Sequence, residues 1–130
     1  MIEYIETTEG ITISMLQGFF AGWRNPHTPE THLEILKKSA YIVLALDRDT
    51  NKIVGFITAI TDFVQSAFIP LLEVLPEYRN RDIGSSLVKR MLEKLNHIYA
   101  IDLICDHELQ GFYQKLGMTP AVGMVIRNYD

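Results

Sequence analysis

The pattern of apolar and polar positions predicts strands and helices that follow one another along the chain. Apolar residues within positions 2–5 favour a first strand. Apolar residues at helical spacing over positions 11–23 predict a helix, which ends before Pro26 because proline cannot continue it. Thr28 as a cap and Pro29 in the first turn predict a second helix.

Two apolar runs, residues 40–46 and 53–60, lie on either side of a polar turn and predict an antiparallel hairpin. The next strand, residues 67–75, carries Pro70, which lacks the N–H group that a strand ladder needs. We therefore expect a bulge or a sheet edge at this proline. Glu73 is the one charged side chain in the strand.

Residues 83–95 predict a helix whose single apolar face lies on the sheet. Its first turn holds Gly84 and Ser85, so backbone N–H groups without an intrahelical partner have little side-chain bulk over them. Such a helix start is suited to an anion. Arg79 and Arg81 add positive charge beside it, which favours a phosphate-bearing ligand.

The last third of the chain predicts three further elements. Residues 99–105 are typical of a strand buried on both faces, and residues 106–116 have the apolar spacing of a short helix. Gly117 then has the position of a helix C-terminal glycine. Residues 124–126 predict a final strand.

Composition narrows the class of protein. A chain of 130 residues fits one domain, residues 1–130, at about 150 residues per domain. No apolar run approaches the ~18 residues of a membrane span, and no secretory signal is visible at the start. The single cysteine, Cys105, cannot form an internal disulfide, which agrees with a reducing compartment, so we expect a cytoplasmic protein.

Charge and ligand spacing exclude other classes. A net charge of −4 argues against nucleic acid as the main partner. Cys105 and His107 could form a Cys–His nucleophile pair, but no third orienting group is identifiable. The run of potential ligands at residues 105–108 lacks the paired spacing of a metal site, so no metal is predicted.

Two motifs resemble signatures of one family. The segment VLPEYRNRDIGSSLV resembles the acetyl-CoA pyrophosphate loop of the GNAT superfamily of N-acetyltransferases, R/Q-x-x-G-x-G/A, between a strand and a helix. Arg79 fills its first position and Gly84 its last, while Asp82 stands where the family has glycine. The segment QGFYQKLGM, residues 110–118, resembles the second signature, F-Y-x-K-x-G-F.

The resemblance implies a mixed α/β fold of GNAT type, in which helices cover both faces of a mostly antiparallel sheet of six or seven strands. The fourth and fifth strands, here residues 71–75 and 100–105, would be parallel neighbours that part beside a bulge. Acetyl-CoA would then be the cosubstrate. The implied cofactor-binding residues are Val74, Leu75, Arg79, Asn80, Arg81, Asp82, Ile83, Gly84 and Ser85, with the pantetheine arm on the backbone of the first two.

The implied activity is transfer of an acetyl group from acetyl-CoA to a primary amine of a small molecule or a peptide, by direct attack in a ternary complex. An alkylammonium has a pKa of about 10, so a general base is required at neutral pH. Glu73 is the candidate base; alternatively it points to solvent or meets an arginine. Tyr113 is the candidate acid by resemblance, and the alternative is an ordinary core tyrosine.

The acceptor and the role of Asp82 stay open. In GNAT-like proteins the early helical segment shapes the acceptor pocket, so Trp23, Arg24, His27 and His32 could contact substrate or be core and loop residues. A homodimer is compatible with the sequence. The second hypothesis is a degenerate CoA-binding or partner-binding module without turnover, with Asp82 as the suspect feature.

Asp82 would approach the cofactor phosphates, so its own contacts matter. It could pair with Arg79 or Arg81, or it could cap the amide groups of Ser85 or Ser86. Aspartate also tolerates positive φ better than most residues, which would keep the backbone path of the missing glycine open.

Overall fold

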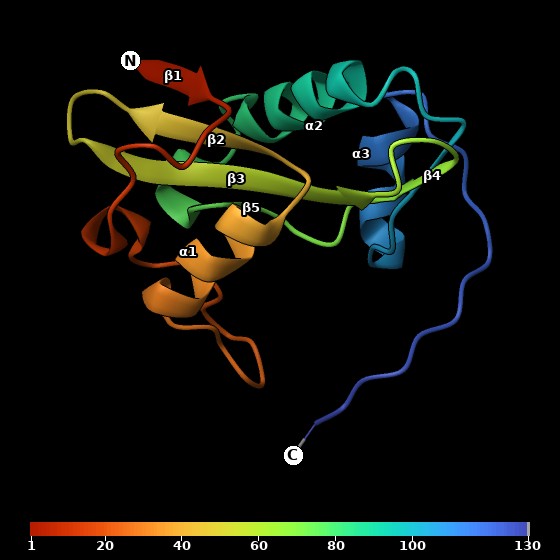
Figure 1. The fold of residues 1–130 in the computed structure, drawn as a ribbon, viewed down its shortest axis with the longest axis horizontal. Helices are drawn as coiled ribbons and strands as arrows, with labels where there is room; N and C mark the ends of the chain where they lie inside the picture. The colour runs from red at the N-terminus through yellow and green to blue at the C-terminus, as the bar shows by residue number, and fades with distance from the viewer. Residues whose placement is uncertain (130) are drawn as a thin grey trace.

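Six strands and three α-helices build the fold that the computed structural model describes for residues 1–129 (Figure 1). The strands are β1 (Ile2–Ile5), β2 (Tyr41–Asp47), β3 (Lys52–Thr61), β4 (Ser66–Phe68), β5 (Leu72–Val74) and β6 (Ala100–Asp102). The α-helices are α1 (Pro29–Lys38), α2 (Ile83–Lys94) and α3 (Gln110–Gln114). Short 3₁₀ turns are η1 (Ile13–Leu16), η2 (Pro76–Tyr78) and η3 (His107–Leu109).

The sheet has the order β1-β2-β3-β4-β6, and β5 also pairs with β3. Every pairing is antiparallel except that of β4 with β6, which is parallel. Helices α1 and α2 cover opposite faces of this sheet (Figure 1). The predicted fold class, a mostly antiparallel sheet with one parallel pair and helices on both faces, is therefore confirmed.

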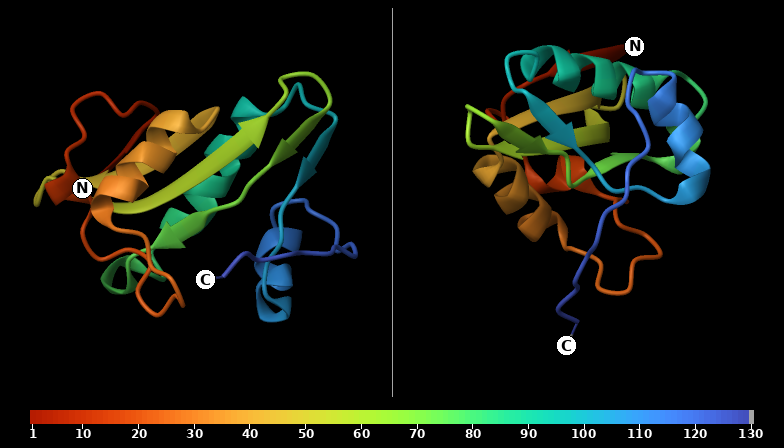
Figure 2. Two further views of the ribbon diagram at one scale, coloured as in Figure 1. Left: turned by 60° about the horizontal axis from the view of Figure 1, so that its bottom comes forward. Right: turned by 90° about the vertical axis from the view of Figure 1, so that its right-hand side faces the viewer.

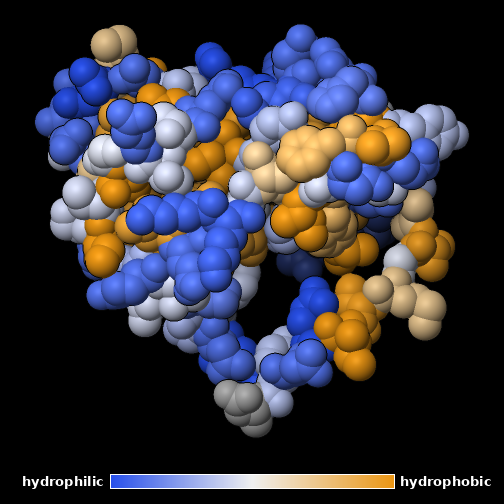
Figure 3. Space-filling model, in the orientation of Figure 1, coloured by the Kyte–Doolittle hydropathy of each residue, from blue (hydrophilic) through white to orange (hydrophobic). Residues whose placement is uncertain are grey.

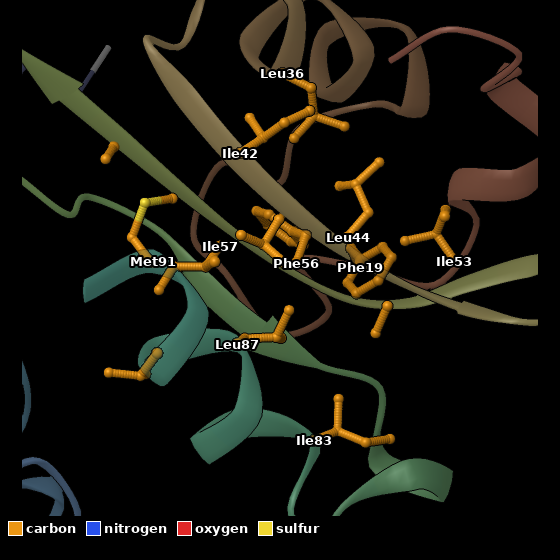
Figure 4. Packing of buried hydrophobic residues seen from close by; sticks show 14 of the residues in the cluster. Phe19, Leu36, Ile42, Leu44, Ile53, Phe56, Ile57, Ile83, Leu87 and Met91 are labelled. Carbon is orange, nitrogen blue, oxygen red and sulfur yellow. The ribbon is translucent and has the colours of Figure 1, made fainter. Parts of the chain in front are cut away.

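The β2–β3 hairpin forms the centre of the core, because its two strands are buried along almost their whole length. From α2, Ile83, Leu87 and Met91 pack toward one face of β3 (Figure 4). Gly55 of β3 makes this approach close, since an added Cβ there would lie 3.2 Å from Leu87 Cδ1. The helix start is thereby held beside the sheet.

The segment that was expected to be one strand is broken at Pro70 into β4 and β5, as its missing N–H predicts. The amide of Ile69 donates the last hydrogen bond to β6, at Asp102 O. Beyond it β5 stays paired with β3 but not with β6, so the two parallel neighbours part (Figure 2). The parallel pairing therefore lies at residues 66–68, upstream of the predicted residues 71–75.

The predicted helix over residues 11–23 is wrong. Only η1 is helical in this region, and the rest is a series of turns. Gly18, Phe20 and Gly22 have φ of 96°, 66° and 84°. These left-handed conformations interrupt a right-handed helix, although the side chains of the segment are still buried at nearly helical spacing.

Helix α1 begins as predicted. Pro29 is its first residue, and Thr28 Oγ1 accepts a hydrogen bond from Thr31 N at 3.1 Å. Gly117, after α3, has φ of 98°, which confirms the predicted C-terminal glycine.

Two predictions for the last third are wrong. Strand β6 is short and only half-buried, because it is the edge strand of the described sheet. Residues 124–126 form no strand and run away from the sheet in extended conformation (Figures 1 and 2). Within residues 1–129, no helix has the length and apolar character needed to cross a membrane.

Candidate functional site

At the start of α2, Asp82 has the left-handed backbone conformation that glycine adopts most readily. Asp82 has φ of 61° and ψ of 15°, and Asn80 before it also has a positive φ. The carbonyl of Asp82 accepts the first helical hydrogen bond, from Ser86 N at 3.0 Å. Its side chain makes no capping bond. The capping hypothesis is therefore wrong, and the expectation of a left-handed Asp82 is confirmed.

Neither arginine of the loop forms an ion pair with Asp82 in the described part of the chain. Arg79 Nε instead donates a hydrogen bond to Val74 O at 3.0 Å. The guanidinium of Arg81 lies 5.0 Å from the centre of the Tyr78 ring. The alternative in which Asp82 pairs with an arginine is therefore wrong, and both exposed guanidinium groups keep N–H donors for an anion.

The first three amide groups of α2 are free to bind a ligand. Within residues 1–129, the N–H groups of Ile83, Gly84 and Ser85 have no hydrogen-bond partner, because the first helical bond is donated by Ser86. They lie at the positive end of the helix dipole. With Arg79 and Arg81 beside them, these amides fit a ligand that carries phosphate groups.

The outer edge of β5 faces the gap beside β6. Leu71 O accepts from Thr58 N, and Leu75 N donates to Val54 O, so Val74 between them points its backbone groups to the opposite edge. The Val74 carbonyl is bound by Arg79, which leaves its N–H for a ligand. Both backbone groups of Leu75 are already used, since its carbonyl accepts from Tyr78 N. The geometry therefore does not support the backbone role predicted for Leu75.

Glu73, the candidate base, lies on β5 and is half-buried. Its two carboxylate oxygens accept hydrogen bonds from the Phe20 N–H at 3.1 and 3.3 Å. Burial raises the pKa of Glu73, and the Phe20 hydrogen bond and the charge of Arg79 partly oppose this. Among the described residues, Glu73 is thus neither a solvated side chain nor the partner of an arginine within salt-bridge distance.

The left-handed Phe20 is a site residue that the sequence reasoning missed. Its positive φ turns the amide toward Glu73, and glycines on both sides permit this path. Gly18 and Gly22, spaced four residues apart in an otherwise apolar helical pattern, were the available signal.

Tyr113, the candidate acid, lies on α3 and is half-buried. Burial, helped by the neighbouring Cys105, raises its pKa to about 12. Its neighbour Phe112 packs against the start of α2, 3.6 Å from where a Cβ on Gly84 would lie. Tyr113 also lines a hollow of about 1060 Å³ between β6, α3 and the C-terminal residues. The second motif therefore lies beside the helix start.

The early segment that would shape an acceptor pocket is rich in aromatic side chains. Phe20 packs against Trp23 and His27, with ring centres 5.0 and 5.1 Å apart, and Trp23 is 46% exposed. His32 is 0% exposed, so of the two alternatives it is a core residue. Burial, with a smaller contribution from His27, lowers the pKa of His32 to about 4. Arg24 lies over the ring of Tyr129.

The fold is that of an α/β protein in which two parallel strands part beside a helix start. The free amide groups of this helix start, with Arg79 and Arg81 beside them, are suited to a phosphate-bearing ligand. The model of the acetyltransferase (GNAT) family matches residues 11–118. The chain therefore belongs to the GNAT family of acetyltransferases, which confirms the resemblance.

The chain is similar to individual proteins of this kind over most of its length. A crystal structure of a candidate acetyltransferase from Deinococcus radiodurans is 43% identical, with a TM-score of 0.93 over 97% of this chain and 87% of that chain. A GNAT-family acetyltransferase from Streptococcus pneumoniae is 30% identical, with a TM-score of 0.75 over 100% of both chains.

A curated relative is longer. The chloroplastic GCN5-related N-acetyltransferase 2 of Arabidopsis thaliana is 29% identical over 90% of this chain. The match covers 54% of the Arabidopsis protein, so this chain spans about half of that relative's length.

Proposed function

We propose that this protein transfers the acetyl group of acetyl-CoA to a primary amine of a small molecule or of an exposed peptide. The observation that carries the proposal is the uncapped start of α2, where three free amide groups lie beside Arg79 and Arg81. Membership of the GNAT family supplies the reaction class. Acetyl-CoA, when bound, provides a thioester whose acetyl carbon accepts the amine.

The residues present fit such a cosubstrate. The amides of residues 83–85 and the two arginines would hold its phosphate groups, together with the exposed Asn80. The free N–H of Val74 in the gap beside β5 would bind an amide carbonyl of the pantetheine arm. Apart from Arg79, whose Nε also donates to Val74 O, this assignment uses polar groups that have no hydrogen-bond partner in the described chain.

Glu73 takes the proton of the attacking amine. Its raised pKa makes it a stronger base than an exposed glutamate, and its hydrogen bond from Phe20 fixes its position. The amine nitrogen then forms a bond to the acetyl carbon, and the bond from that carbon to sulfur breaks.

Tyr113 donates to the departing sulfur. A pKa of about 12 keeps its phenol protonated throughout the neutral range. A thiol has a pKa near 8.5, so complete proton transfer from this phenol to the thiolate is unfavourable by about 3.5 pKa units. Tyr113 therefore acts mainly by donating a hydrogen bond as negative charge develops on sulfur.

The test is release of free thiol from acetyl-CoA against a panel of amines, preceded by a calorimetric titration with CoA. Direct attack gives sequential kinetics. Ping-pong kinetics, or an acetyl group retained on Cys105, would favour a covalent intermediate and contradict the proposed mechanism.

A degenerate binding module is the second candidate, and the exposed carboxylate of Asp82 favours it. Asp82 has no ion pair in the described chain. At about 6 Å from a phosphate charge and an effective dielectric near 20, the repulsion is roughly 3 kcal/mol before screening by solvent. CoA binding without thiol release for any amine would identify such a module, and absence of binding would reject both proposals.

A further inference from the structure

Asp47 is the one carboxylate that is buried among the described residues, at 8% exposed. It ends β2, where its backbone pairs with Ile2 of β1 and Lys52 of β3, so the sheet fixes its position from both sides. Its Oδ1 accepts a hydrogen bond from Asp49 N at 2.9 Å. The exposed turn that follows, residues 48–51, lies at the left edge of Figure 1, where hydrophilic residues gather on the surface (Figure 3). Hydrogen bonds to Asp47, and not burial, therefore order this turn.

The second oxygen of this carboxylate binds a residue next to the candidate site. Tyr78, in η2, donates its phenol proton to Asp47 Oδ2 at 2.5 Å, the length of a charge-assisted hydrogen bond. This hydrogen bond lowers the pKa of Asp47 and raises the pKa of Tyr78, so a carboxylate and a neutral phenol meet at neutral pH. Neither residue takes part in the proton transfers assigned to Glu73 and Tyr113.

The ring of Tyr78 contacts the loop that precedes α2. The guanidinium carbon of Arg81 lies 5.0 Å from the ring centre, within the range of a cation–π contact. A hydrogen bond to a carboxylate increases the electron density of the ring, which strengthens its attraction for a cation. Arg79 is held separately, because its Nε donates to Val74 O of β5. The sheet therefore restrains both arginines of the loop, one of them through Tyr78.

We propose that Asp47 and Tyr78 are positioning residues for cosubstrate binding, which hold the Arg81 guanidinium beside the start of α2. An exposed arginine loses side-chain entropy when it binds an anion, and a ring that already restrains it reduces this loss. The identity of the ligand rests on the proposed function, whereas the two contacts of Tyr78 exist without a ligand. Loss of these contacts weakens the binding of CoA and leaves the acid–base groups in place.

The first experiment is a calorimetric titration with CoA. Tyr78→Phe keeps the ring but loses the hydroxyl group, and should weaken CoA binding by about threefold. Tyr78→Leu keeps an apolar side chain against the core but loses both contacts, and should weaken binding by about tenfold. Turnover at saturating acetyl-CoA should stay within about twofold of the parent, while the KM for acetyl-CoA rises.

A double-mutant cycle separates positioning of Arg81 from a general effect on the fold. In an Arg81→Gln background no cation lies over the ring, so Tyr78→Leu should weaken CoA binding by less than about twofold. Tyr4→Leu is the matched control, because Arg90 lies 4.3 Å from the centre of the Tyr4 ring on a later turn of α2. This control should leave CoA affinity unchanged. An equal loss from Tyr78→Leu with and without Arg81 would overturn the proposal.

The second experiment measures hydrogen exchange of the protein without CoA, so it does not depend on the proposed function. The amides of Tyr78 and Arg79, which donate the hydrogen bonds of η2, should exchange about fivefold faster in Tyr78→Phe and in Asp47→Asn. Asparagine has one side-chain oxygen for the two donors that Asp47 binds, so one of these bonds is lost. The amide of Leu95, at the far end of α2, should keep the parent rate.

The two experiments fail in different ways. If the parent binds no CoA but the exchange rates change as expected, the proposed function is rejected and the restraint of the loop by Asp47 and Tyr78 stands. Unchanged exchange of the Tyr78 and Arg79 amides in both variants would overturn the inference even if CoA binds.

Discussion

At the scale of single residues, the contact between Glu73 and the Phe20 amide determines the predicted acid–base chemistry. A hydrogen bond from an uncharged amide holds the carboxylate in place, and burial keeps its pKa raised. No arginine within salt-bridge distance cancels this effect among residues 1–129. In the proposed function, Glu73 is therefore a base whose strength comes from its environment.

For Glu73→Gln, we expect loss of the acidic limb of the pH–rate profile, because the group that must be deprotonated is gone. Glutamine keeps an oxygen that can accept from Phe20 N, so the fold should be retained. The raised pKa means that ionisation of Glu73 opposes folding at neutral pH, so the thermal midpoint at pH 7 should not fall. Glu77→Gln, an exposed position on η2, is the control. An unchanged acidic limb would assign the base elsewhere.

For Tyr113→Phe, we expect turnover to fall by about a hundredfold, the lower end for loss of a proton donor. CoA affinity, measured by calorimetry, should be nearly unchanged, because the phenol contacts neither the helix start nor β5 through a hydrogen bond in the described chain. Tyr99→Phe is a suitable control, since Tyr99 is 87% exposed before β6. Equal activity of both variants would remove Tyr113 from the mechanism.

At the scale of elements, the loop before α2 combines a left-handed backbone at Asp82 with a carboxylate that would repel the phosphate groups of CoA. Asp82→Gly should tighten CoA binding by about tenfold, less than the unscreened repulsion implies because Asp82 is exposed. Glycine relieves the strain of the positive φ, which stabilises the folded state, but it also increases the conformational freedom of the unfolded chain, which destabilises it. Because these effects oppose each other, the free energy of unfolding should change by less than about 0.5 kcal/mol. No helix cap is lost in this substitution, because the side chain of Asp82 makes no capping hydrogen bond.

Asp82→Asn separates charge from backbone freedom in this loop. Asparagine tolerates the left-handed conformation and carries no charge. Tighter CoA binding by both variants at low salt, with a smaller difference at high salt, would identify charge as the cause. Weaker binding by the glycine variant would instead mean that Asp82 orders the loop.

The contact between α2 and β3 predicts opposite effects for two glycine substitutions. Gly55→Ala places a Cβ 3.2 and 3.3 Å from Leu87 and Ile83, so we expect a loss of about 1–3 kcal/mol in the free energy of unfolding. Gly84→Ala meets its nearest atom at 3.6 Å and lies in a helix, so stability should be unchanged or rise by up to about 1 kcal/mol. Urea unfolding measures both. Equal losses would contradict the packing argument.

The sequence predicted the elements whose determinants are local. The cap at Thr28, the break at Pro70 and the glycine after α3 each depend on one residue with a strong backbone preference. The helix over residues 11–23 failed because burial at helical spacing does not require helical φ, as Phe20 shows. The final strand failed because strand formation needs a partner edge, which periodicity cannot supply.

At the scale of the whole molecule, the sequence motifs could indicate a candidate site, but the contacts within it could not be predicted. Two motifs placed the helix start and Tyr113 in the chain, and the fold brings α2 and α3 together through Phe112 and Gly84. The pairing of Glu73 with Phe20 joins residues 53 positions apart and depends on a backbone conformation that no motif encodes. Long-range contacts of this kind need the structure.

The global stability of the molecule should fall in acid because of His32. Its ring is 0% exposed, packs on Phe19, Phe20 and Phe56, and both ring nitrogens lack a hydrogen-bond partner within the described chain. The pKa falls from 6.5 to about 4 on folding, so below pH 6.5 the unfolded state binds a proton that the folded state refuses. This group alone should remove about 3 kcal/mol from the free energy of unfolding between pH 7 and pH 4.

The substitution His32→Phe tests this origin of acid sensitivity. Phenylalanine suits the aromatic cluster and cannot titrate, so the variant should lose the His32 share of the pH dependence, whatever its absolute stability. Urea unfolding at several pH values between 4 and 7 measures the difference in slope between variant and parent. His97→Gln, at an exposed position after α2, should leave the slope as it is. A His32→Phe protein with the slope of the parent would mean that His32 is protonated within the folded core, and that the core can hydrate or open around it.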